Sequence, residues 1–266
     1  MFLPEELYKL YSEPMIAKFM ATLDKEGKPN IAFIASIDTW EPDSDILIFG
    51  EFLMWKSFQN LKGNRKVGTL AVNLALEFAQ INGDFNNDFK NVGPYFDRIA
   101  YNDMFRYNAY TKIRQAGTIK IKEHFPVKKI GKLEVLADMF AVKGKKGKLK
   151  GEKGVEIPLN VKEKFDQMQA IKALAFVPEG KEYPFIVPVM SLYPIDMKSM
   201  AFKVSASNPE LKGLKNGQDT ALMVLTMDAI AYQVKGTVDS FDGKFGKIVI
   251  TEAFSSSPPL AGQKIA

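Results

Sequence analysis

The chain has 266 residues, of which 46% are hydrophobic, and its 36 basic and 31 acidic residues give a formal net charge of +5. This length suits one large domain or two ordinary ones, and the apolar content is sufficient for a substantial core. The chain has no cysteine, which excludes disulfides, thiolate-bound metals and a disulfide-stabilised secreted scaffold. We expect a cytoplasmic protein.

The excess positive charge lies in one segment. Residues 143–153, KGKKGKLKGEK, hold six lysines and one glutamate, so their local charge of +5 equals that of the whole chain. We interpret this segment as a solvated connector. Binding to nucleic acid or anionic lipid is the weaker reading, because no aromatic residues alternate with the lysines to stack on bases.

The N-terminal residues contain early acids and a helical apolar spacing, unlike a secretion signal. No uninterrupted apolar run is long enough to span a bilayer, so no membrane role is expected.

The first 90 residues predict short strands joined by tight turns. Residues 15–24 and 31–37 flank the turn DKEGKPN and predict a β-hairpin. Asp45 to Phe49 predicts a third strand, and VGTLAVNLAL and FAQINGDF predict two more. Residues 55–62 suit a short helix, with Trp55, Phe58 and Leu61 on one side in the core or an interface.

A longer helix is predicted next. It begins at Gly93-Pro94 and runs to Gly117, with proline near its start and glycine just past its end. The following residues, TIKIKEHF, alternate as a strand.

The chain also contains an internal repeat. Shifting it by 153 positions aligns residues 15–85 with residues 168–238, and the hydrophobic pattern stays in register. The identities include Met15/Met168, Ala17/Ala170, Phe49/Phe202, Gln80/Gln233 and Gly83/Gly236. The strand predicted at AYQVKGTV aligns with FAQINGDF, and KIVITEAF matches TIKIKEHF.

The repeat predicts the domain organisation and the fold class. We expect a first unit over 1–140, a Lys/Gly-rich linker over 141–160 and a second, degenerate unit over 161–266. Short strands with tight turns and few helices favour a mainly β protein built from β-barrels with accessory helices.

One position differs between the copies in a chemically important way. Lys56 and Ser57 fall in the first turn of the predicted helix, where free backbone N–H groups and the positive end of the helix dipole attract phosphate. The aligned residues are Pro209 and Glu210. Because a carboxylate repels phosphate, only the first copy is expected to bind one.

These residues also carry a family resemblance. The run ATLDKEGKPNIAFIASI and the later ILIFGEFLMWKSFQNLKGNRKVGTLAVN resemble the pyridoxamine 5′-phosphate oxidase-like FMN-binding split barrels. The resemblance covers most of residues 10–130 and, more weakly, 165–255. It implies two tandem split barrels that form an intramolecular pseudo-dimer, with FMN at their junction.

The resemblance also implies the binding residues. Lys56 and Ser57 would hold the FMN phosphate, and residues from the second and third strands would lie beside the ring and ribityl chain, namely Phe33, Ile34, Ala35, Ser36, Gly50, Glu51, Phe52 and Leu53. Tyr193 and Tyr232 are candidates for a wall supplied by the second barrel. The substrate-binding basic residues of true pyridoxamine phosphate oxidases have no clear counterpart.

Two functions follow. The first is an FMN-dependent oxidoreductase or electron-transfer protein that meets a small-molecule substrate or redox partner and could associate as a homodimer. The alternative is a non-catalytic module that binds haem, a deazaflavin or a protein. No side chain stands out as a catalytic acid or base; His124 is expected to face solvent, and the aspartates fit no metal-ligand spacing.

Overall fold

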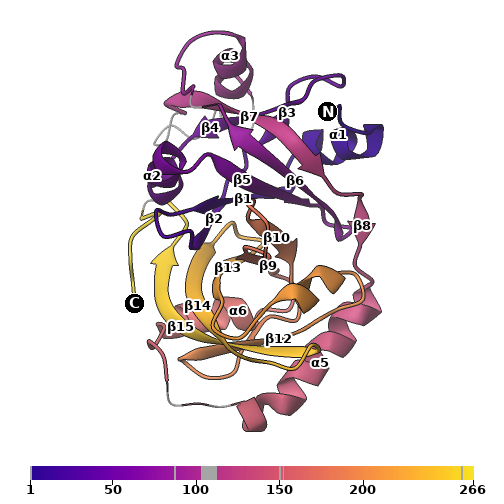
Figure 1. Cartoon of the computed structure of the whole chain (residues 1–266), viewed down its shortest axis with the longest axis vertical. Helices are drawn as coiled ribbons and strands as arrows, with labels where there is room; N and C mark the ends of the chain where they lie inside the picture. The colour runs from indigo at the N-terminus through magenta and orange to yellow at the C-terminus, as the bar shows by residue number, and fades with distance from the viewer. Residues whose placement is uncertain (1, 87, 103–112, 150, 152, 259) are drawn as a thin grey trace.

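The computed structural model describes residues 2–86, 88–102, 113–149, 151, 153–258 and 260–266. Its two halves are stacked along the long axis of the molecule (Figure 1). The first half contains, in chain order, α1 (Glu5–Ser12), β1 (Ala17–Leu23), β2 (Pro29–Phe33), β3 (Asp38–Thr39), β4 (Ile46–Glu51), α2 (Trp55–Gly63), β5 (Lys66–Val72), β6 (Glu77–Phe85), α3 (Pro94–Ala100), β7 (Gln115–His124) and β8 (Lys128–Lys129).

The second half repeats this order in a shorter form. After the connecting helix α5 (Lys132–Leu149) come α6 (Leu159–Asp166), β9 (Ile171–Phe176), β10 (Phe185–Pro188), β11 (Tyr193–Pro194), β12 (Ser199–Lys203), the 3₁₀ helix η1 (Pro209–Gly213), β13 (Asp219–Leu225), β14 (Ala231–Phe241) and β15 (Phe245–Ser255).

The two sheets have the same topology. In the first, the strand order is β2-β1-β5-β6-β7-β4-β3, with β8 added beside β6; in the second it is β10-β9-β13-β14-β15-β12-β11. All these pairings are antiparallel. This confirms the predicted mainly β class, with two tandem split barrels.

Individual hydrogen bonds repeat as well. The Ser36 hydroxyl accepts from the backbone N–H of Gly50 at 2.9 Å and donates to the same residue's carbonyl at 3.3 Å. The Ser191 hydroxyl does the same with Lys203, at 3.1 Å in both directions. Ser36 and Ser191 are therefore structural equivalents, two positions beyond the 153-residue offset of the repeat.

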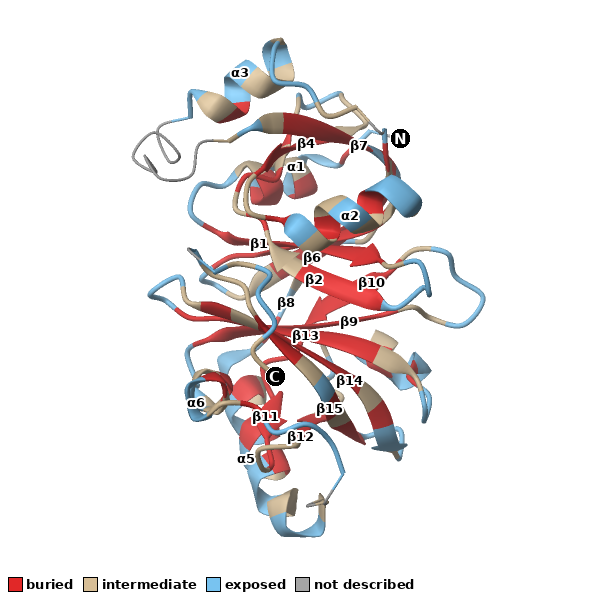
Figure 2. Ribbon diagram, turned by 90° about the vertical axis from the view of Figure 1, so that its left-hand side faces the viewer, coloured by how far each residue is buried: buried red, intermediate tan, exposed pale blue. Residues whose placement is uncertain are grey.

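Buried side chains form a core inside each barrel and a third core between them. The junction core joins strands of both halves and includes Phe19, Ile31 and Leu70 with Ile186 and Met223. Figure 2 shows this buried layer across the middle of the molecule, whereas the outer sides of α3 and α5 are exposed. Burial of apolar surface is the main force that holds the two halves together.

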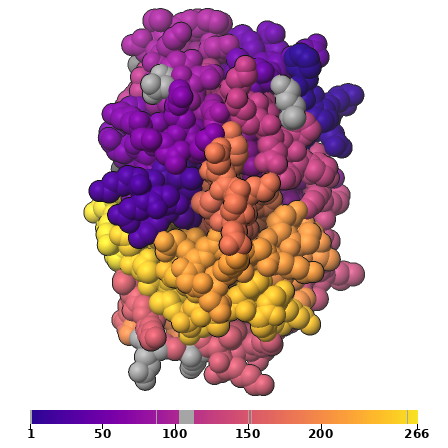
Figure 3. All heavy atoms as spheres, viewed as in Figure 1, coloured from indigo at the N-terminus to yellow at the C-terminus, as the bar shows by residue number. Residues whose placement is uncertain are grey.

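Each half also extends a hairpin turn onto the other half across the junction. The β9–β10 hairpin reaches over the first half (Figure 3), where the Tyr183 hydroxyl donates to Asp84 at 3.0 Å and Glu182 lies 3.1 Å from Lys66. In the opposite direction, Asp24 of the β1–β2 turn lies 3.9 Å from Lys235.

Two glutamines that the repeat aligned make the closest reciprocal contacts. The side-chain oxygen of Gln80 accepts from the backbone N–H of Ile186 at 2.9 Å. Gln233 accepts from the N–H of Ile31 at 3.4 Å and donates to its carbonyl at 2.8 Å. Each half thus caps the edge strand of the other, as in an isologous dimer with a twofold axis.

The prediction of one helix to Gly117 is wrong at its C-terminal end. Helix α3 extends over Pro94–Ala100, while Gln115, Ala116 and Gly117 belong to β7; residues 103–112 lie outside the described part of the chain. Gly117 serves packing, because a Cβ there would lie 2.6 Å from the Phe49 ring. Gly246 has the same relation to Phe202.

The Lys/Gly-rich segment begins as helix. Residues 141–149, expected as part of a solvated linker, are the last turns of α5, which packs on the second barrel through Val135, Met139 and Val142. Several of its lysines lie over aromatic rings; Lys143, for example, is 4.8 Å from the Tyr193 ring centroid.

Candidate functional site

The start of α2 has no side-chain cap. The chain leaves β4 through a bend in which Leu53 adopts a left-handed φ of 47° and redirects the backbone into the helix. Met54 is the N-cap and provides no side-chain hydrogen bond, and the first turn contains no acidic residue. The N-terminal amides are therefore without a side-chain cap, at the positive end of the helix dipole.

A small cleft opens at this helix end, with a volume of about 40 Å³. Both halves and the C-terminal segment contribute to its walls. The lining residues are Asn30, Ile31, Ala32, Phe33, Ile34, Leu53, Met54, Trp55, Lys56, Ser57, Gln233, Ser256, Ala261 and Gly262.

Asn30 gives the cleft an unused hydrogen-bond acceptor. Its side-chain nitrogen donates to the Ser57 hydroxyl at 3.1 Å, and both residues are almost completely buried. Its side-chain oxygen has no partner. A buried polar atom without a partner is costly, so this oxygen is available to a ligand that carries a donor.

Lys56 supplies positive charge that the protein does not neutralise by a direct ion pair. Its Nζ lies 3.5 Å from the centroid of the Phe254 ring, and no carboxylate of the described residues lies within ion-pair distance. The pKa of Lys56 is lowered to about 8, mainly by burial and also by Lys235 and Lys264, while Glu252 and Asp24 act in the opposite direction. An anion beside this ammonium would stabilise its charged form.

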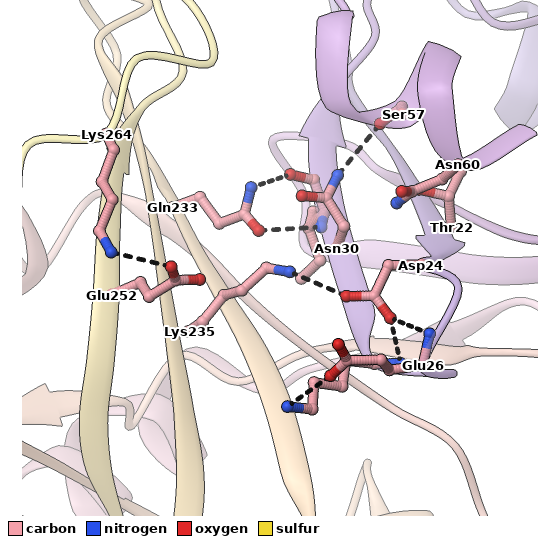
Figure 4. A network of polar contacts seen from close by, with 12 residues as sticks. Thr22, Asp24, Glu26, Asn30, Ser57, Asn60, Gln233, Lys235, Glu252 and Lys264 are labelled. Atoms are coloured by element: carbon pink, nitrogen blue, oxygen red, sulfur yellow. Dashed lines mark hydrogen bonds and ion pairs between the residues drawn. The ribbon is translucent and has the colours of Figure 1, made fainter.

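The second barrel closes the cleft with polar groups. Figure 4 shows Gln233 on β14 paired with the backbone of Ile31, next to the Asn30–Ser57 hydrogen bond. Lys235 of the same strand points towards Asp24, and Glu252 on β15 is held by Lys264 at 2.9 Å. The site therefore requires both halves.

The C-terminal segment occupies the outer part of the cleft. After β15 it folds back on its own strand, with backbone hydrogen bonds from Gly262 to Ser255 at 2.8 Å and from Ile265 to Ala253 at 2.8 Å. Gly262 lies against Trp55. Ser256, Ala261 and Gly262 of this segment therefore form part of the cleft wall.

The structure brings together only some of the predicted binding residues. Lys56, Ser57, Phe33, Ile34 and Leu53 all line the cleft. The remaining five do not: Ala35 and Ser36 line a neighbouring polar pocket, Gly50 packs against Ile113, and Glu51 and Phe52 follow it on the way to α2. Burial raises the pKa of the Glu51 carboxyl, while Arg114 lowers it.

Neither tyrosine proposed for the second-barrel wall lines the cleft. Tyr193 packs near α5, and the hydroxyl of Tyr232 accepts a hydrogen bond from Asn160 at 2.9 Å. Side chains alternate across a strand, so Gln233 faces the cleft while its neighbour Tyr232 faces away. The Gln80/Gln233 identity was the sequence signal that could have indicated this residue.

Trp55 also differs from the prediction. It is 48% exposed at the mouth of the cleft, where it lies under the Arg114 guanidinium at 4.7 Å, and it is not part of a core. Leu61 of the same helix is buried as expected.

The equivalent place in the second barrel is closed. There, Glu210 of η1 forms an ion pair with Lys128, and its other carboxylate oxygen is buried without a hydrogen-bond partner. Phe125 packs edge-on against Phe185 beside it, with ring centroids 5.1 Å apart. A negative charge and two rings thus stand where the first barrel presents Lys56 and Asn30.

The part of the chain that the structure describes offers few other groups for metal binding or catalysis. No group of three or more His, Asp or Glu side chains is arranged to hold a metal ion there. His124 is half-buried at the end of β7. Among the described helices, none is both long and apolar enough to cross a membrane.

No protein-family model and no curated protein matches the chain. Among solved structures, an FMN-binding protein from Syntrophomonas wolfei subsp. wolfei is 21% identical, with a TM-score of 0.41 over 48% of this chain and 87% of that chain. HupZ of Group A Streptococcus is 20% identical, with a TM-score of 0.38 over 46% and 92%. HutZ, the heme storage protein of Vibrio cholerae, is 11% identical, with a TM-score of 0.34 over 48% and 94%.

Each match covers about half of this chain, the length of one barrel. Both halves have the strand order given above. The matched structures include an FMN-binding protein and a heme-storage protein.

Proposed function

We propose that the protein binds one FMN per chain, with the phosphate at the start of α2. The observation that carries the proposal is Lys56, an ammonium in a half-buried place without a carboxylate partner, beside an uncapped helix N-terminus. This combination of a free cation and free amides favours a phosphate monoester over a neutral ligand.

The remaining cleft residues fit the rest of the cofactor. The unpaired oxygen of Asn30 can accept a hydrogen bond from a ribityl hydroxyl, and the amide of Gln233 lies opposite it. Phe33, Ile34 and Leu53 offer apolar contact to a ring. A bound flavin would supply the redox chemistry, and the role of these side chains is to bind and orient it.

The cleft requires one rearrangement. Ligand sites are usually about 300 Å³ or larger, whereas this cleft holds about 40 Å³, enough only for a small group. The isoalloxazine ring can enter when Ser256, Ala261 and Gly262 move away from Trp55 and β2. Among its described residues, the C-terminal segment is held by backbone hydrogen bonds to β15, by contacts of Ser256 and Ser257 with Ala231 of β14, and by the Lys264–Glu252 ion pair.

A titration of the flavin-stripped protein with FMN, followed by quenching of flavin fluorescence, tests the proposal. Saturation at one FMN per chain is expected, and riboflavin, which lacks the phosphate, should bind at least about tenfold more weakly. Equal affinity for both would contradict the phosphate site. No binding of either would overturn flavin binding and favour a non-catalytic module.

A further inference from the structure

A larger cavity lies where the two halves meet. Its volume is about 320 Å³, and Phe33 is the one residue that it shares with the cleft at α2. The lining residues are Met15, Ile16, Ala17, Phe33, Ala35, Val72, Leu74, Ile171, Leu225, Thr226, Met227 and Ala229. No charged side chain is among them, and Thr226 contributes the only side-chain hydroxyl.

Equivalent positions of the two halves face each other across this cavity. Ala17 pairs with Val72 in the first sheet, and Ile171 pairs with Leu225 at the same place in the second. All four line the cavity. The cavity therefore lies between equivalent strand positions of the two barrels, whereas the cleft at α2 lies to one side.

The halves differ at one position that lines the cavity. The matched hydroxyl contacts of Ser36 and Ser191 make Ala35 the counterpart of Met190. The side chain of Met190 is buried in the junction core, whereas Ala35 lines the cavity. The short side chain of Ala35 thus leaves room in the first half, where the equivalent position of the second half has the longer side chain of Met190.

The mouth of the cavity is unusual for a protein surface. Met15, Leu74 and Met227 are 78%, 71% and 63% exposed, although each also lines the cavity. Met15 and Ala229 hold left-handed φ angles of 61° and 57°, which are unfavourable for residues other than glycine. Exposed apolar side chains and strained backbone at one opening are typical of a binding site.

We propose that this cavity binds an uncharged, largely apolar small molecule, independently of the flavin cleft. A charged ligand is disfavoured because no lining side chain could compensate the loss of its hydration. The volume is within the range of small-molecule sites. The flexible methionines at the rim can adapt to the ligand and cover it.

Neutral N-phenyl-1-naphthylamine, whose fluorescence rises in apolar surroundings, is a suitable probe for the full-length protein without FMN. We expect one site per chain and much weaker binding of the anionic probe 8-anilinonaphthalene-1-sulfonate. Ala35→Met places the second half's side chain in the cavity, so it should lower affinity for the neutral probe roughly tenfold. Met190→Ala is the matched control, which leaves the cavity open and should not weaken binding.

Thermal unfolding of both variants shows whether they are folded. Undiminished probe binding by folded Ala35→Met, or an equal loss in both variants, would overturn the proposed site. Sedimentation at rising protein concentration tests whether a second copy of the chain covers the mouth of the cavity. In that case the chain will dimerise as its concentration rises, and probe binding will fall. That result would also overturn the small-molecule site.

Discussion

The loops after β4 and β12 occupy the same place in their barrels, but they end in different structures. The first leads into α2, nine residues long with Lys56 in its first turn, and the second into η1, a five-residue 3₁₀ turn that begins with Pro209-Glu210. Around Lys56 a polar oxygen and backbone amides remain free, whereas Glu210 already has a cation as its partner. Two copies of one fold thus keep their strands and differ in charge at the helix end where we propose that phosphate binds.

Changing the charged residue in each half is the strongest way to test this difference. Lys56→Glu places a carboxylate against the phosphate and should lower FMN affinity by about a hundredfold or more. The matched variant Glu210→Ala should change it little. Fluorescence titration measures both, and a similar loss in the two variants would show that the halves do not differ in this way.

A pair of equivalent buried lysines offers a second comparison. Lys18 in β1 lies near Asp38 and Glu13, whereas the Nζ of Lys172 in β9 is completely buried without a hydrogen-bond partner. Burial lowers the pKa of Lys172 to about 8. Because this pKa lies below that of an unfolded lysine, the charged form weakens the fold below pH 8, and stability should rise as pH increases from 8 towards 10.5.

Lys172→Met should therefore raise the free energy of unfolding at pH 7 by about 2 kcal/mol and remove that rise with pH. Lys18→Met is the control and should stabilise less, since Asp38 and Glu13 both favour the charged form of Lys18, whereas Asp166 favours and Lys143 disfavours that of Lys172. Denaturant unfolding at pH 7 and pH 9.5 measures both effects. If Lys172→Met instead lowers the free energy of unfolding, the buried ammonium of Lys172 stabilises the fold.

The pH dependence of FMN binding sharpens the role of Lys56. Its pKa of about 8 is low because the site is partly buried and near Lys235. Phosphate binds the charged form, so affinity should fall about tenfold between pH 7 and pH 9 as the free protein loses that proton. Lys56→Arg stays charged and should bind with a flatter pH profile; an identical fall in both proteins would point to another group.

Removal of residues 258–266 is expected to have the smallest effect. It frees the cleft beside Trp55, so FMN should associate several-fold faster in stopped-flow measurements, because the segment no longer has to move. Lys264→Glu, which breaks the ion pair with Glu252, is a milder version and should change the rate in the same direction. Slower association in both folded variants would show that the segment forms part of the binding site.

The sequence predicted the fold better than the site. Apolar alternation and the 153-residue repeat gave the strands and the two barrels, because these patterns follow from which faces are buried. Gly117 was misread because a glycine after an amphipathic run resembles a helix stop, while its actual neighbour is the ring of Phe49, distant in sequence.

The site residues that sequence analysis missed also come from positions far apart in the sequence. Lys56 and Ser57 could be inferred because a helix start binds anions by local geometry. Asn30, Gln233 and the C-terminal segment reach the same cleft from separate parts of the chain. Trp55 was predicted from its helical spacing to lie in the core or an interface, and only the tertiary structure shows that its side of α2 meets the cleft.

The reciprocal contacts of Gln80 and Gln233 also have an evolutionary consequence. In an assembly of two identical chains, any mutation alters both ligand sites at once, so a change that closes one site closes the other. Joined in a single polypeptide, the halves can keep the glutamine contacts that hold them together while each site changes separately. Glu210 and Lys128 could therefore close one site without any cost to the site at Lys56.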